Sequence, residues 1–313
     1  MTPSPRLPTG AAGAIAFAVL LALPAASALA QNRGVYPLGM TATNSGSVAA
    51  PGFTYTNAFL FYGRDESKGP DGETIATGTN SVLMDMNTVA WASEPVAALS
   101  NLRYSIAATI PIANNSLDSD VSGPISGGGG LADSYYQPLI LGWAFARADL
   151  RAAYGFLAPT GRFQAGASDN VGSGYWTHTL SLGENVYVTK DRATVLSAYQ
   201  IYEFHTTQEG TDVHPGQTLS VDYSLTRKVA LGKDMQLQAG LAGYDQWQTT
   251  ARTGPDVTSA EMAARYRVNA IGAAANLLFP GRKVSLGAKY LKEFSNRSTF
   301  QGYSLQIFGS ISL

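Results

Sequence analysis

The stretch from Gln217 to Thr226 reads QTLSVDYSLT and alternates apolar and polar residues along its whole length. Successive side chains of a β-strand point to opposite faces, so this stretch predicts a strand with one apolar face and one polar face. The apolar face would carry Leu219, Val221, Tyr223 and Leu225. In a membrane barrel, such a face lies against lipid and the polar face lines the lumen.

Eleven further segments of similar length show related alternation. With the first stretch, extended to 216–227, they give twelve predicted strands, at 53–62, 80–91, 101–112, 136–147, 149–158, 175–188, 193–204, 216–227, 235–246, 264–278, 282–293 and 302–313. Connections after odd-numbered strands are mostly long, as at 63–79, 113–135 and 159–174. Those after even-numbered strands are mostly short, as at 189–192 and 279–281. We therefore predict an all-β fold, a transmembrane antiparallel up-and-down β-barrel of about twelve strands, with both termini on the periplasmic side.

The first thirty residues have the layout of a secretory signal peptide. Arg6 is their single charge, residues 11–23 form a short apolar stretch, and Ala28-Leu29-Ala30 is a small-x-small cleavage site. The expectation is cleavage near Ala30 and a location in the bacterial outer membrane. Residues 31–51 have few apolar positions and are predicted to be a flexible N-terminal segment or a plug-like lead-in, and 52–313 the barrel.

Composition narrows the classes of function. Charged residues make up 14% of the chain, well below the usual quarter of a soluble domain, which favours a membrane barrel. The formal net charge of −1 does not indicate a nucleic-acid partner. The absence of cysteine excludes disulfides, thiol catalysis and thiolate metal sites.

Charged residues within the predicted strands are assigned to the lumen, because Arg or Lys facing lipid near the membrane midplane costs about 2–4 kcal/mol. The candidate lumen and selectivity residues are Asp85, Arg103, Arg151, Asp222, Arg267, Lys289 and Glu293. Aromatic residues with inward or nearly inward parity give a candidate path for an aromatic solute, namely Tyr175, Tyr187, Tyr244 and Phe308. The alternative is that these rings only fill the interior, as they do in small barrels.

Catalytic and metal motifs were sought around the three histidines. Barrel phospholipases pair His and Ser two residues apart, whereas His178, His205 and His214 are followed at that spacing by Leu180, Thr207 and Gly216. A triad assembled across strands stays open as an alternative. No His-rich metal spacing is found, and the glycine run 127–130 lacks the Lys and Ser or Thr of a phosphate loop, which favours a flexible hairpin tip. We expect no enzyme activity, no metal and no cofactor.

Several short motifs occur in an order that points to one family. They are Leu131-Ala132-Asp133 followed by Gln137-Pro138 and Trp143, then Pro159-Thr160-Gly161-Arg162-Phe163, then Asn170-Val171-Gly172 with Tyr175-Trp176, and finally Tyr202-Glu203-Phe204, Gly216, Asp222, Gly243-Tyr244 and Gln246. Over about residues 50–313 the chain resembles outer-membrane proteins of the MetA pathway of phenol degradation. It departs from the pattern at Leu131, which stands where the family has glycine, and ends in Leu313 where many outer-membrane barrels end in Phe.

The resemblance implies a transporter that passes hydrophobic or aromatic compounds across the outer membrane. We therefore expect passive uptake of small solutes of this kind, with outer-membrane lipid and, during biogenesis, the barrel assembly machinery as partners. Two alternatives from other classes stay open. One is a membrane-embedded hydrolase, and the other is a closed barrel with a structural or surface-interaction role.

Overall fold

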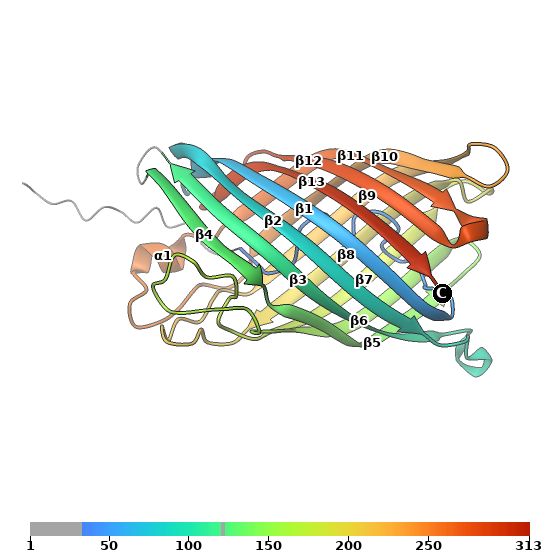
Figure 1. Cartoon of the computed structure of the whole chain (residues 1–313), viewed down its shortest axis with the longest axis horizontal. Helices are drawn as coiled ribbons and strands as arrows, with labels where there is room; N and C mark the ends of the chain where they lie inside the picture. The colour runs from blue at the N-terminus through green and yellow to red at the C-terminus, as the bar shows by residue number, and fades with distance from the viewer. Residues whose placement is uncertain (1–32, 120–122) are drawn as a thin grey trace, which may run out of the picture.

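The computed structural model of the chain describes residues 33–119 and 123–313 and shows a closed antiparallel barrel (Figure 1). The predicted signal peptide and its cleavage site near Ala30 lie outside the described residues. Twelve strands form the wall: β1 (Gly52–Lys68), β2 (Thr74–Ala92), β3 (Arg103–Ser119), β5 (Ser134–Ala144), β6 (Ala148–Ala158), β7 (Thr177–Tyr187), β8 (Thr194–His205), β9 (Thr218–Ala230), β10 (Gln236–Gln248), β11 (Arg267–Phe279), β12 (Val284–Glu293) and β13 (Phe300–Ser312). The ring closes because β1 pairs with both β2 and β13. The predicted fold class and strand number are confirmed.

A further strand, β4 (Gly123–Leu131), was not predicted. It pairs with one half of β3 while β5 pairs with the other half. Gly129 and Gly130 thus lie in a strand opposite Asn114 and Ala113, so the prediction of a flexible hairpin tip at 127–130 was wrong. The predicted loop 63–79 is also largely strand, because β1 and β2 continue through most of it. The backbone pairing of β1 with β2 continues beyond the apolar band of the barrel wall. The side chains there do not alternate between apolar and polar, so the sequence pattern does not reveal these strand ends.

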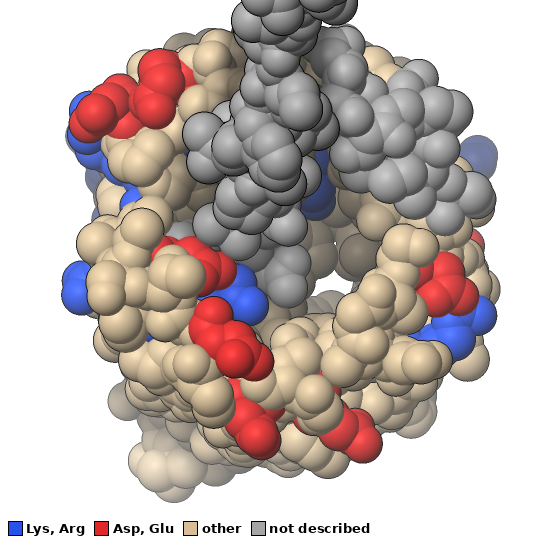
Figure 2. Space-filling view, turned by 90° about the vertical axis from the view of Figure 1, so that its left-hand side faces the viewer, with Lys and Arg blue, Asp and Glu red and all other residues tan. Residues whose placement is uncertain are grey.

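The two rims of the barrel differ in their connections. One rim carries the longest ones, 159–176, 206–217 and 249–266, the last of which contains the short helix α1 (Ser259–Ala263). The other rim carries the turns 145–147, 188–193, 231–235 and 280–283, with the 3-10 helix η2 (Pro280–Arg282) in the last, and the longer connection 93–102 with η1 (Ala97–Leu99). Figure 2 looks onto the loop-bearing rim, where an opening is visible right of the centre and acidic and basic side chains lie around the edge. Within the described part of the chain, no helix is long and apolar enough to cross a membrane.

Burial follows the predicted alternation. On β9, Thr218, Ser220 and Asp222 are fully buried on the inward face, whereas Leu225 on the other face is 49% exposed. The outward faces of the other strands carry many further exposed apolar side chains, among them Leu180, Leu241 and Ile307. The apolar exterior and the polar interior are what a lipid-facing barrel requires.

Two of the charged residues assigned to the lumen face outward, so their assignment was wrong. Asp85 shares the outward parity of Leu83 on β2, while Met84 and Met86 face inward. Both faces of β2 carry apolar residues, so alternation on this strand does not separate the inward face from the outward face, and the cost of a lipid-facing charge was overvalued. The Asp85 carboxylate accepts a 2.6 Å hydrogen bond from Asn57, which also faces outward.

Arg267 is the second residue whose inward assignment was wrong. Arg267 is exposed and is the first residue of β11, at the loop-bearing rim. Its guanidinium carbon lies 5.9 Å from the ring centroid of Trp247, on the outer face of the barrel. Its neighbour Val268, not Arg267, shares the inward parity of the buried Ala270. Charge is tolerated there because a strand end at the rim meets water rather than hydrocarbon.

We predict that Asp85→Leu stabilises the folded barrel by up to about 2 kcal/mol, because it removes an ionisable group from the apolar belt. Leu83→Asp, a change at the neighbouring outward position of the same strand, should destabilise it. The measurement is the free energy of unfolding by urea in phospholipid vesicles. A loss of stability in Asp85→Leu would contradict the prediction, since it would mean that the hydrogen bond from Asn57 outweighs the cost of an ionisable group in the apolar belt.

Candidate functional site

Residues 33–50, called the plug from here on, precede β1 and run inside the barrel, as the blue segment of Figure 1 shows. They bond to inward-facing side chains of β7 to β13, from Asn185 on β7 to Gln306 on β13. Within a closed barrel, backbone N–H and C=O groups without water must find such partners. The plug is therefore hydrogen-bonded along one side of the lumen.

The start of the plug is held by an ion pair. Arg33 donates from its two terminal nitrogens to the two carboxylate oxygens of Glu293, at 2.6 and 3.1 Å. The same carboxylate accepts from Tyr62, Tyr244 and Asn296 at 2.6, 3.0 and 3.0 Å. Both oxygens of Glu293 are thus satisfied, which compensates the cost of burying the charge.

The middle of the plug is held by Asp222 on β9. Its carboxylate accepts hydrogen bonds from the backbone N–H groups of Gly39 and Thr41, at 3.0 and 3.1 Å, and from the hydroxyl of Tyr36 at 2.6 Å. Burial raises the pKa of Tyr36 well above its usual value, and the nearby Asp222 charge raises it further, so the hydroxyl stays a donor. Lys289 completes this anchor by donating to the carbonyl oxygens of Gly39 and Met40 at 2.7 and 2.5 Å.

Gly39 is required where the plug turns beside the wall. Its φ of +78° lies in the left-handed region that favours glycine. A Cβ at this position would lie 2.4 Å from a methyl carbon of Leu291 and 3.0 Å from the ring of Tyr244. The plug backbone thus approaches the wall as closely as a residue without a side chain allows.

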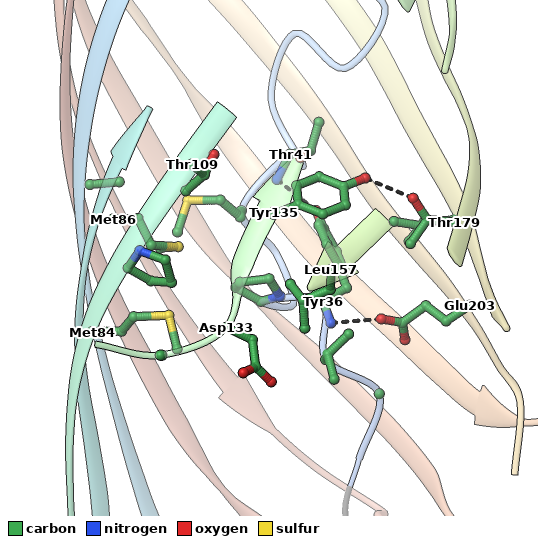
Figure 3. Close-up of a pocket in the computed structure, with 18 of the residues that line it drawn as sticks. Tyr36, Thr41, Met84, Met86, Thr109, Asp133, Tyr135, Leu157, Thr179 and Glu203 are labelled. Carbon is green, nitrogen blue, oxygen red and sulfur yellow. Dashed lines mark hydrogen bonds between the residues drawn. The ribbon is translucent and has the colours of Figure 1, made fainter. Parts of the chain in front are cut away.

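The other side of the lumen is open. A cavity of about 600 Å³ lies between the plug and the wall formed by β1–β3, β5–β8 and β13. Figure 3 shows Met84 and Met86 on one side of it, Glu203 and Thr179 on the other, and Tyr135 nearby. Its lining also includes Met40, Ala58, Pro111, Leu157 and Phe308. An apolar cavity of this size with a few polar groups suits a small organic ligand.

The structure brings some of the predicted residues to this site. Arg151, Tyr175 and Phe308 line the cavity, while Asp222, Lys289 and Glu293 anchor the plug. Tyr187 and Tyr244 are buried but contact Asp149 and Glu293 instead of lining the cavity. Arg103 lies near the short-turn rim, where it donates to the carbonyl oxygen of Ala49. Asp85 and Arg267 are not brought together with the others, since they face outward.

Sequence reasoning offered a plug-like lead-in at 31–51 as one of two interpretations but singled out none of its residues, and it missed two cavity-lining groups. Tyr36 and Met40 lie in a segment with no strand alternation, so no pattern assigned them to the lumen. Met84 was missed because its strand is apolar on both faces. Arg64 fell in the predicted loop 63–79, although its even parity continues from Ala58 and Tyr62, and that continuation was the signal for its inward direction.

The histidines occupy three different settings, of which that of His214 is the connection 206–217, where its backbone pairs with that of Thr253. His178 faces outward, where its Nδ1 lies 2.9 Å from the hydroxyl of Tyr154, and His205 faces inward with its Nδ1 2.8 Å from the hydroxyl of Thr177. Among the described residues no carboxylate bonds to His205, so this pair lacks the third group of a hydrolase triad. No group of three or more metal-binding side chains is found over 33–119 and 123–313.

Comparison with known families gives one match that covers most of the chain. The model of the family described as "Putative MetA-pathway of phenol degradation" matches residues 64–307. The family resemblance inferred from the short motifs is thereby confirmed. No curated protein matches the chain.

Solved structures with the same fold include an outer membrane channel from Pseudomonas putida F1, which is 12% identical with a TM-score of 0.69, the match covering 87% of this chain and 98% of that one. The beta domain of the Bordetella autotransporter BrkA is 11% identical with a TM-score of 0.49, and the match covers 84% of this chain and 100% of that one. At these identities the first likeness supports the barrel fold, and the second is too distant to carry an argument.

We predict that Asp222→Asn loosens the plug and raises single-channel conductance in planar bilayers. A side-chain amide offers one acceptor oxygen and one NH₂ group, so it cannot accept from the three donors that converge on Asp222. The control is Asp65→Asn, since Asp65 lies outside the lumen beside Lys292. Heat-modifiable mobility on gels checks that both variants are folded. Equal conductance of a folded Asp222→Asn barrel and the unchanged protein would contradict the anchoring role.

Proposed function

The chain belongs to the MetA-pathway of phenol degradation family, and on that premise we propose that it is a bacterial outer-membrane barrel for passive uptake of small hydrophobic or aromatic compounds. The observation that carries the proposal is the cavity beside the plug, lined by methionine, proline and phenylalanine side chains. Polarizable and adaptable thioether side chains suit apolar ligands of varied shape. The function needs no covalent chemistry and no cofactor.

The route that we propose begins at the loop-bearing rim. Val171 and Ser173 of the connection 159–176 line the cavity, so this loop lies at its outer end. Asp133, buried between β4 and β5, accepts from the backbone N–H groups of Gly161 and Ser173 at 2.9 and 2.7 Å. A solute would pass beneath this loop, over Met84 and Met86, and along the plug toward the periplasm.

The plug also gives support to one alternative, a closed barrel. Asp222, Glu293 and Lys289 all bind it, so passage requires that solutes move beside it or that it shifts. We favour a transport function because the cavity keeps about 600 Å³ of the lumen free next to these anchors. The hydrolase alternative has less support, since His205 pairs with a threonine hydroxyl and lacks a carboxylate partner among the described residues.

The proposal includes the export of the protein and its insertion into the outer membrane. Residues 1–30 would direct export and be removed near Ala30, and the barrel assembly machinery would insert the mature chain into the outer membrane. The Pseudomonas putida relative is itself described as an outer membrane channel, which supports this location. Arg151 and Asp222 then become candidates for tuning which solutes pass.

We predict that Met84→Trp abolishes most barrel-dependent uptake, because an indole at this inward position occupies the cavity. Leu83→Trp is the matched control, since it places the same ring on the outward face of the same strand, where Leu83 is 50% exposed. The measurement is the initial rate of radiolabelled naphthalene uptake by cells with and without the barrel. Equal uptake by the two kinds of cell would contradict transport and favour the closed barrel.

A further inference from the structure

Arg64 on β1 lies inside the barrel and lines the cavity, yet it has no carboxylate partner among the described residues. Its Nε is buried and forms no hydrogen bond there. A buried donor without a partner costs free energy, about 1–3 kcal/mol and more for a charged group. Such a donor beside a cavity is placed to bind an acceptor that enters the cavity.

Two aromatic rings hold the guanidinium of Arg64 in place. Its central carbon lies 5.0 Å from the ring centroid of Tyr62 and 4.7 Å from that of Phe300. In a cation–π contact the cation lies over the face of the aromatic ring, and the ring does not take the place of a hydrogen-bond acceptor in the guanidinium plane. The two rings therefore fix the orientation of Arg64 without using its donors.

The nearest carboxylate, that of Glu293, is already satisfied. Arg33 binds both of its oxygens, and Tyr62, Asn296 and the backbone N–H of Gly302 donate to Oε2 at 2.6, 3.0 and 2.9 Å. Glu293 thus neutralises Arg33 and leaves the charge of Arg64 without a counterion. The electrostatic pattern around Tyr62 is two cations and one anion.

The remaining carboxylates of the cavity are also hydrogen-bonded. Asp133 accepts from Gly161 and from the N–H and hydroxyl of Ser173, and Glu203 accepts from the N–H of Tyr36 at 2.8 Å and from the hydroxyl of Thr218. Arg151 has a neutral partner, Gln137, at 3.2 Å. These other charged groups of the cavity thus have partners, whereas the Nε of Arg64 has none among the described residues.

We infer that Arg64 binds the carboxylate of a small aromatic acid whose ring points along the cavity toward Met84. A guanidinium fork matches a carboxylate in shape and binds it through two parallel hydrogen bonds. Arg64 lies six residues beyond Ala58 toward the loop-bearing rim, so the carboxylate would bind near the outer end of the cavity and the ring deeper. The inference rests on the proposed uptake function and specifies its substrate class as small aromatic carboxylates.

The test compares benzoate with neutral benzyl alcohol on the purified barrel in detergent at pH 7, with dissociation constants from saturation-transfer NMR titrations. Benzoate is ionised at this pH because carboxyl groups lose their proton near pH 4. The unchanged barrel should bind benzoate about tenfold more tightly than benzyl alcohol, as one charge-assisted pair predicts. Arg64→Gln should remove this preference and leave benzyl alcohol binding unchanged, and Arg64→Lys should keep part of it.

The control variant is Arg267→Gln, because Arg267 is an exposed arginine on the outer face and should not affect either ligand. Equal affinity of the unchanged barrel for both ligands overturns the inference, and this comparison decides even if Arg64→Gln does not fold. Equal weakening of both ligands by Arg64→Gln also overturns it, since Arg64 would then only support the cavity. The uptake function and the carboxylate site can fail separately. If naphthalene uptake depends on Met84 but the barrel shows no preference for benzoate, the uptake function stands and the carboxylate site is wrong.

Discussion

The interior of this barrel depends on hydrogen bonds between a short N-terminal segment and inward-facing charged side chains. Asp222 accepts from two plug N–H groups and one hydroxyl, and Lys289 donates to two plug carbonyl groups. A closed wall of twelve strands satisfies its own backbone, but the plug has no ladder and must bond to side chains. These bonds give the buried charges of β9 and β12 a structural role that an open aqueous pore would not require.

Because the plug bonds to one side of the lumen, the two halves of the interior differ in chemistry. The side next to β9–β12 is filled with polar contacts to the plug, while the side bounded by β1–β3, β5–β8 and β13 keeps a cavity of about 600 Å³ with methionines on its wall. Arg64 stands at the boundary between them, held by Tyr62 and Phe300. The arrangement thus combines an apolar surface with one charge whose donors are free, and selection of aromatic acids follows from that combination.

The sequence allowed the barrel to be predicted because lipid imposes a strict alternation on the wall, and β9 shows it without exception from Thr218 to Thr226. It failed where that constraint is absent. The strand β4 is rich in glycine and lies beyond the lipid-facing band of the wall, so its side chains show no alternation. Asp85 lies on a strand that is apolar on both faces. The cavity was only partly predictable, since Tyr175 and Phe308 have inward parity, whereas Met40 and Tyr36 belong to a segment without any period.

The central claim is that the cavity beside the plug is the place where an aromatic solute binds inside the barrel. Its most direct test is a crystal structure of the barrel soaked with a brominated aromatic solute, with the bromine located by anomalous diffraction. The account predicts a bromine peak inside the lumen, between Met84, Met86 and Phe308. A bromine found only on the outer apolar face, with an empty lumen, would contradict it.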